Sequence, residues 1–258
     1  MNEKSLKRVF FVLPLLFLCF IVLMKLSVPY KYFKWFIRED GPLEWVQFLA
    51  YLSTSLIAFA ASLKLYGKKQ KFHAFLYLVF AVGTFLISME EISWGQRIFH
   101  IPTPEKVGRV NLQHEFNLHN MLPGKKLHLF FIVTGFYGAF LRFLLPGRIK
   151  KEHPDGVGLL TPAKYLFFYF FPVFFFYFYY DYVSRLDLLI FGDNGPFGRG
   201  FTRGYKAEEP GEFLLSMGFL IFTGMNTLRL RASRLVPQKP FEFARTDELP
   251  ACMGKDIR

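Results

Sequence analysis

Six long apolar runs divide the sequence, and they set the strongest limit on its fold. The first, Val9–Val28, is nearly all apolar. At about 1.5 Å per residue, a helix of about 20 residues spans a hydrocarbon core of about 30 Å. A soluble protein with buried helices is disfavoured, because polar faces are missing over too much of the chain. We therefore predict an all-α fold, a polytopic membrane helix bundle with transmembrane helices at about 9–28, 43–65, 74–94, 127–145, 163–190 and 211–230.

Residues 1–236 are expected to form a single transmembrane domain, and 237–258 a poorly ordered cytoplasmic tail rich in Pro and charge. The first run follows three basic residues, as in a signal peptide. It is longer than the apolar core of such a peptide and no cleavage site follows, so we expect a retained helix. The two cysteines, Cys19 and Cys252, lie in different environments and are not expected to pair.

Basic residues indicate how the chain is oriented in the membrane. The net charge is +12, and the Lys and Arg residues lie in loops and at helix ends, where they contact lipid headgroups and set topology. The loops on the side of the N-terminus carry 19 of them and the opposite loops 12. This bias predicts that both termini are cytoplasmic. No basic–aromatic nucleic-acid motif occurs, so we expect membrane lipids as partners and no nucleic acid.

Acidic residues show the opposite bias, with 13 of 20 at the outer helix ends or in the outer loops. Basic cytoplasmic loops would displace acids outward, which explains part of this bias. This displacement does not readily explain Glu90 and Glu91, because both are attached directly to an apolar helix. An ionisable group costs about 2.5–3.5 kcal/mol at the centre of a transmembrane helix, and less at its mouth. We therefore treat the two glutamates as candidate site residues.

The outer loop 95–126 is long for a structureless connection. We expect its residues 110–121 to form a short interfacial or re-entrant helix. Glu115 and His119 are at i and i+4, so they project from one face of that helix. A carboxylate and an imidazole so placed can bind one metal ion, although the pair would equally suit the polar face of an interfacial helix.

The predicted metal site combines these two residues with Glu91, and His128 is a further candidate ligand. Two carboxylates and one histidine leave an open position for water, as a catalytic zinc or iron site requires. The expected cofactor is a divalent metal: zinc, iron or manganese. Glu90, or Glu209 or Glu212 at the start of the sixth helix, would act as general base on a metal-bound water.

Adjacent glutamates point about 100° apart on a helix, so Glu90 and Glu91 cannot be equal ligands. We expect Glu91 to face the bundle as a metal ligand or as a catalytic base, and Glu90 to pair with Arg97 or with a donor from the loop. Both could instead be structural partners of arginines. Asp181 and Arg185, at i and i+4, favour a salt bridge within the fifth helix. A second interpretation is that Arg97, Arg185 or Arg203 holds an anionic headgroup or a phosphate.

The fifth apolar run is aromatic on all sides, with Phe or Tyr at nearly every position from 167 to 180. This pattern favours a lipid-facing helix with interfacial tyrosines. The alternative is that its aromatic side chains line a groove for a lipid tail.

Three sequence blocks resemble those of a family of uncharacterised bacterial integral membrane proteins. They are Glu39-Asp40-Gly41 with Glu44-Trp45, the run 90–97 (EEISWGQR), and Asn111 with Glu115 and Asn117-Leu118-His119-Asn120. The resemblance covers roughly the first half of the chain. It implies a multi-pass protein of the bacterial cytoplasmic (inner) membrane and no particular activity.

The favoured function is a metal-dependent enzyme that acts at the outer leaflet on a lipid or lipid-linked substrate. The main alternative is a non-catalytic subunit of a larger membrane complex. A proton or ion pathway ranks third, because its acids should be distributed through the membrane, and here they stop at one interface. No P-loop, GxSxG elbow or HExxH motif occurs.

Overall fold

The computed structural model describes residues 2–38, 41–103, 124–183, 190 and 209–232. Within these ranges the regular elements are helices, and six are long and apolar enough to cross a membrane. The spans are built on α1 (Glu3–Ser27), α3 (Pro42–Gly67), α4 (Lys71–Glu91), α7 (Gly124–Leu144), α10 (Phe167–Phe178) and α13 (Glu209–Ala232). The predicted all-α membrane bundle is confirmed. The predicted helix at 110–121 and the tail 237–258 lie outside the described residues.

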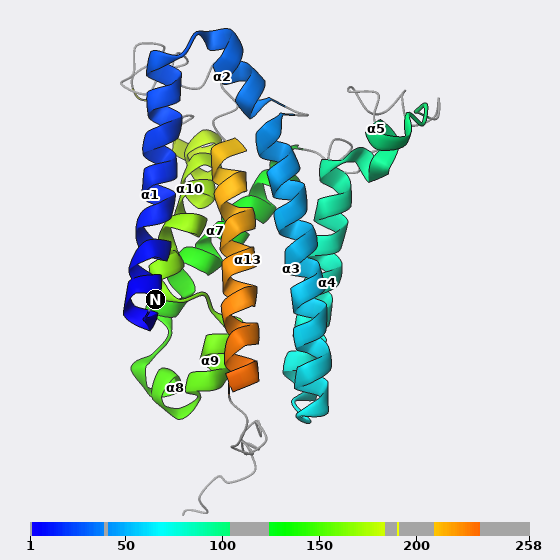
Figure 1. The fold of residues 1–258 in the computed structure, drawn as a ribbon. Coiled ribbons are helices and arrows are strands. Elements are labelled where there is room, and N and C mark those ends of the chain that lie inside the picture. Colours follow the sequence, from blue (N-terminus) through cyan, green and yellow to red (C-terminus); the bar gives the residue numbers. More distant parts are fainter. Residues whose placement is uncertain (1, 39–40, 104–123, 184–189, 191–208, 233–258) are drawn as a thin grey trace, which may run out of the picture.

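Helix α13 occupies the middle of the bundle (Figure 1). It packs against α3 on one side and against α10 on the other, while α3 pairs with α4 and α10 pairs with α7. The short helix α2 (Tyr30–Ile37) connects the end of α1 to the region where α3 begins, and it buries Phe33 and Ile37. Helix α13 is therefore the element that joins the two halves of the bundle.

Small residues bring α3 and α4 into close contact. Ala58 and Ala61 are fully buried at this interface. The Ser55 hydroxyl donates to Ala81 O at 2.8 Å, and the Ser62 hydroxyl donates to Ala74 O at 2.7 Å. Close approach and interhelical hydrogen bonds replace the hydrophobic effect as the source of helix association in lipid.

Helix α10 lies in the core rather than wholly at the lipid surface. Tyr169, Phe170, Val173 and Tyr177 are buried on one of its faces. The prediction of a lipid-facing helix is wrong for this face, although Phe175 and Phe178 on other faces are exposed. The physical reason is the close approach of α7, whose glycines leave room for the aromatic rings.

Several boundaries differ from those predicted. The third transmembrane helix was expected to reach residue 94, but α4 ends at Glu91, because the next residues adopt a left-handed turn. The fifth span begins earlier than predicted, with the short helix α9 (Pro154–Leu160), followed by the 3-10 turn η3 (Lys164–Leu166). After α10 the chain continues as the π-helix η4 (Tyr179–Val183). Two further short helices are α5 (Gln96–Phe99) and α8 (Gly147–Glu152).

Candidate functional site

Carboxylates from three helices meet at one end of the bundle, which we call the acidic end. Glu44 lies in the first turn of α3, Glu90 and Glu91 end α4, and Glu209 and Glu212 lie in the first turn of α13. Electrostatic repulsion reaches Glu91 from all four of the others, Glu212 most strongly. The structure thus brings together the four glutamates that we singled out as catalytic candidates, and it adds Glu44.

The two adjacent glutamates of α4 have different surroundings. Glu90 Oε1 accepts a hydrogen bond from Trp94 Nε1 at 2.6 Å. Glu91 instead faces the acids of α3 and α13. Glu90 thus has a donor from the turn that follows α4, while the functional roles expected for the two glutamates stay predictions. Arg97, the other expected partner of Glu90, lies in α5, and its side chain is not among those that the structure describes.

A left-handed turn fixes the position where α4 stops. Ser93, Trp94 and Gly95 have φ angles of 47°, 56° and 79°. Residues other than glycine are uncommon in this region, and such conformations are concentrated at functional sites. Ser93 and Gly95 are buried, so the turn is held by packing. It stops the helix directly after Glu91 and leaves that carboxylate at the end of the bundle.

Gln47 is the residue that sequence reasoning missed. Its side chain is 0% exposed, and neither its amide nitrogen nor its amide oxygen has a hydrogen-bond partner within the described ranges. Glu44, Gln47 and Tyr51 lie at i, i+3 and i+7, so they share one face of α3. That face points toward the acids, because Glu91 and Glu212 act electrostatically on the Tyr51 hydroxyl. The only signal in the sequence was a lone glutamine in an apolar run, one turn after Glu44.

An unsatisfied buried amide has a cost of about 1–3 kcal/mol. Native structures rarely keep such a group without a water, an ion or a catalytic role to account for it. The Gln47 amide therefore needs a hydrogen-bonding partner that the described residues do not supply.

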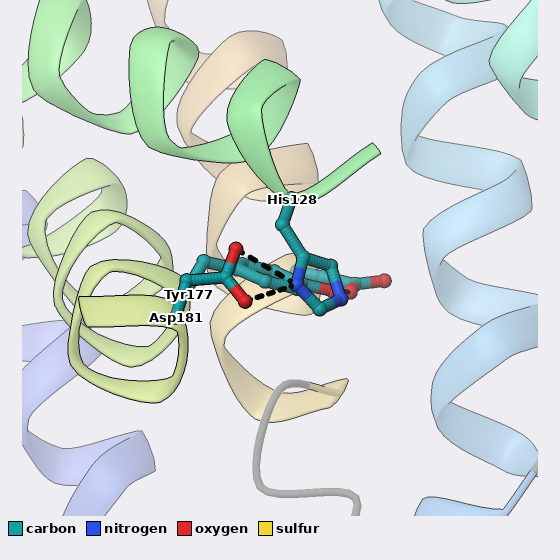
Figure 2. A network of polar contacts seen from close by, with 4 residues as sticks. His128, Tyr177 and Asp181 are labelled. Carbon is teal, nitrogen blue, oxygen red and sulfur yellow. Dashed lines mark hydrogen bonds and ion pairs between the residues drawn. The ribbon is translucent and has the colours of Figure 1, made fainter. Parts of the chain in front are cut away.

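A second polar network connects α7, η4 and α13 beside this cluster. Figure 2 shows His128 of α7 and Asp181 of η4 pointing toward each other. Nδ1 of His128 lies 3.0 and 3.1 Å from the two carboxylate oxygens of Asp181. The His128 ring also packs on that of Tyr177, with centroids 4.8 Å apart, and the Tyr177 hydroxyl donates to Glu212 Oε1. Asp181 thus pairs with His128, whereas its expected partner Arg185 lies outside the described residues.

Asp181→Asn tests whether this pair holds the acidic end together. The variant should lower the free energy of unfolding by about 1 kcal/mol, because a half-buried charge-assisted hydrogen bond is weakened. Thermal unfolding in mild detergent would measure this change. Glu152→Gln is the matched control, because its exposed partner Arg148 makes a surface pair of little energetic value. Equal midpoints for the two variants would contradict a stabilising role for Asp181.

The other predicted ligands, Glu115 and His119, lie outside the described residues. Among the residues that the structure does describe, no three His, Cys, Asp or Glu side chains are placed to hold a metal ion. The described glutamates of the acidic end therefore repel one another, but no three of them are placed to share one ion.

Comparison with known proteins gives no assignment: no family model, no curated protein and no solved structure matches the chain. What the fold shows is a multi-pass helical membrane protein.

Proposed function

We propose that the protein is a membrane-embedded, metal-dependent enzyme whose acidic end acts on a lipid or lipid-linked substrate. The observation that supports this proposal is the gathering of Glu91 with carboxylates of α3 and α13 beside the unpartnered amide of Gln47. Like charges at one site disfavour ionisation, and a bound cation relieves that repulsion. Carboxylate and amide oxygens are ligands that suit manganese, whereas added imidazole would suit zinc or iron.

The proposed ligands are Glu91, Glu115 and His119, with His128 as a further ligand. His128 is suited to this role, because its Nδ1 is bound to Asp181 and its Nε2 is left for a metal. Metal-binding histidines commonly bond a carboxylate through their other ring nitrogen, which fixes the tautomer and the ring orientation.

The metal would supply an activated water, and the acids of α13 would take up its proton. Glu212 is the better-placed base, because the Tyr177 hydroxyl orients its carboxylate. Glu209, one turn earlier, is the second candidate, and Glu90 is oriented by Trp94. Arg97 and Arg185 would hold an anionic headgroup. We place this end at the outer face of the bacterial inner membrane, in accord with the distribution of basic residues.

Elemental analysis of the purified protein tests the proposal. The wild-type chain should carry about one equivalent of zinc, iron or manganese. Glu91→Gln should reduce this content at least about tenfold, because a carboxylate ligand is lost. Glu152→Gln, which changes one carboxylate far from the acidic end, should leave it unchanged. A wild-type protein without stoichiometric metal would contradict the proposal.

The second candidate function is a non-catalytic subunit of a membrane complex. The hydrogen bonds of Glu90 with Trp94, Glu212 with Tyr177 and Asp181 with His128 favour it, since they are also what a structural network would need. This function predicts a stable partner that co-purifies in mild detergent and no bound metal. A monomer that carries metal would argue against it.

A further inference from the structure

The end of the bundle opposite the acidic end contains a second cluster of polar side chains, around α9. Arg142, in the last turn of α7, donates from Nη1 to Thr161 Oγ1 at 3.1 Å and to Val157 O at 3.4 Å. Thr161 in turn donates to Val157 O at 2.7 Å. These bonds hold the guanidinium of Arg142 against the last turns of α9.

Two more basic side chains border the same short helix. A Cβ atom built on Gly158 would lie 3.6 Å from Nη1 of Arg229, and one built on Gly156 would lie 3.6 Å from Nε2 of His73. No side chain of α9 therefore separates these groups from its backbone. The three basic residues come from three different spans, α4, α7 and α13, so only the tertiary structure brings them together.

The two arginines are close enough to repel each other. Within the described ranges neither forms an ion pair with a carboxylate, although α9 itself carries the exposed Asp155 in its first turn. Arg229 makes no hydrogen bond in this part of the structure, and Arg142 uses only Nη1. Several guanidinium N–H groups are thus available to one anion between the helices.

The position of the cluster indicates the kind of anion. Arg142 and Arg229 lie near the ends of their spans, where lipid headgroups are found. Phe143 and Leu144, next to Arg142, are exposed and would contact acyl chains. Basic pockets between transmembrane helices are a recurrent binding site for anionic headgroups.

We propose that Arg142 and Arg229, with His73 beside them, bind the phosphate of an anionic phospholipid against α9. Guanidinium groups are well suited to this ligand, because their paired N–H groups match two phosphate oxygens. The site shares no residue with the acidic end, so the test of this lipid site is independent of the test of the proposed enzymatic function.

Native mass spectrometry of the protein released from nanodiscs would test this site. In nanodiscs of phosphatidylcholine with added phosphatidylglycerol, the wild-type chain should retain phosphatidylglycerol selectively. Arg229→Gln should bind this lipid about fivefold more weakly, the loss expected for one basic side chain near a membrane surface. This variant removes no hydrogen bond of the described structure, so the fold should persist.

Arg148→Gln is the matched control, because it removes the same charge at the same end of the bundle from an exposed residue that pairs with Glu152. Its lipid binding should equal that of the wild type. The proposal is overturned if the two variants behave alike, or if the wild type does not prefer the anionic lipid. A further outcome would identify a soluble ligand instead of a lipid. If inorganic phosphate displaces phosphatidylglycerol from the wild type, and if its binding is weakened equally by Arg229→Gln, the site binds a soluble phosphate and the assignment to a lipid is overturned.

Discussion

Replacement of Gln47 by methionine is expected to stabilise the protein and to weaken its metal binding. Methionine has nearly the shape of glutamine, so the packing around α3 should be kept. The variant removes a buried amide whose two polar atoms lack partners in the described structure. Relief of that desolvation should raise the free energy of unfolding by about 1–3 kcal/mol.

A stabilising substitution at a buried polar residue is the mark of a group kept for function rather than for the fold. We therefore expect the two effects in the same variant: a higher midpoint of thermal unfolding in the metal-free protein, and a lower metal content by elemental analysis than in the wild type. A purely structural glutamine would give the opposite sign of stability change.

Gln96→Met provides the control for this experiment. The Gln96 amide donates to Thr103 Oγ1 at 2.5 Å, so its removal should lower stability or leave it unchanged. If Gln47→Met also destabilises the protein, the amide has a partner in the folded state and Gln47 is not part of a ligand site.

Gly135→Ala is expected to be among the most damaging single-methyl changes in the bundle core. A Cβ atom at this position of α7 would lie 2.7 Å from the backbone nitrogen of Phe174 and 2.9 Å from its Cα. Backbone atoms of α10 cannot rotate away as a side chain can, so the two helices must separate. Overpacking of this kind costs about 1–3 kcal/mol, which exceeds the gain of about 1 kcal/mol from the helix propensity of alanine.

The matched control is Gly83→Ala in α4, where a Cβ atom would meet nothing within 4 Å. This variant should be neutral or slightly stabilising. Thermal unfolding of both variants in the same detergent would measure the difference. Gly135→Ala with a midpoint as high as that of Gly83→Ala would mean that α7 and α10 do not pack as closely as described.

The aromatic helix α10 shows where sequence reasoning reached its limit. Its phenylalanines suit contact with either lipid or protein, because lipid tails are as apolar as a protein core. The pattern of residues therefore does not show which face of the helix is buried. The glycines of α7 decide the matter. They allow the ring of Phe170 to pack at the centre of the bundle, where it is fully buried.

The sequence by itself determined the membrane bundle and the end at which its acids gather. Both follow from local properties of the chain. Each apolar run is long enough to cross the membrane, and successive spans begin and end on alternate sides of it. Only the tertiary structure decided which polar groups meet: Glu91 with the acids of α3 and α13, Gln47 beside them, His128 with Asp181, and Arg142 with Arg229. These residues are far apart in sequence, and the packing of α13 between the two halves of the bundle sets their distances.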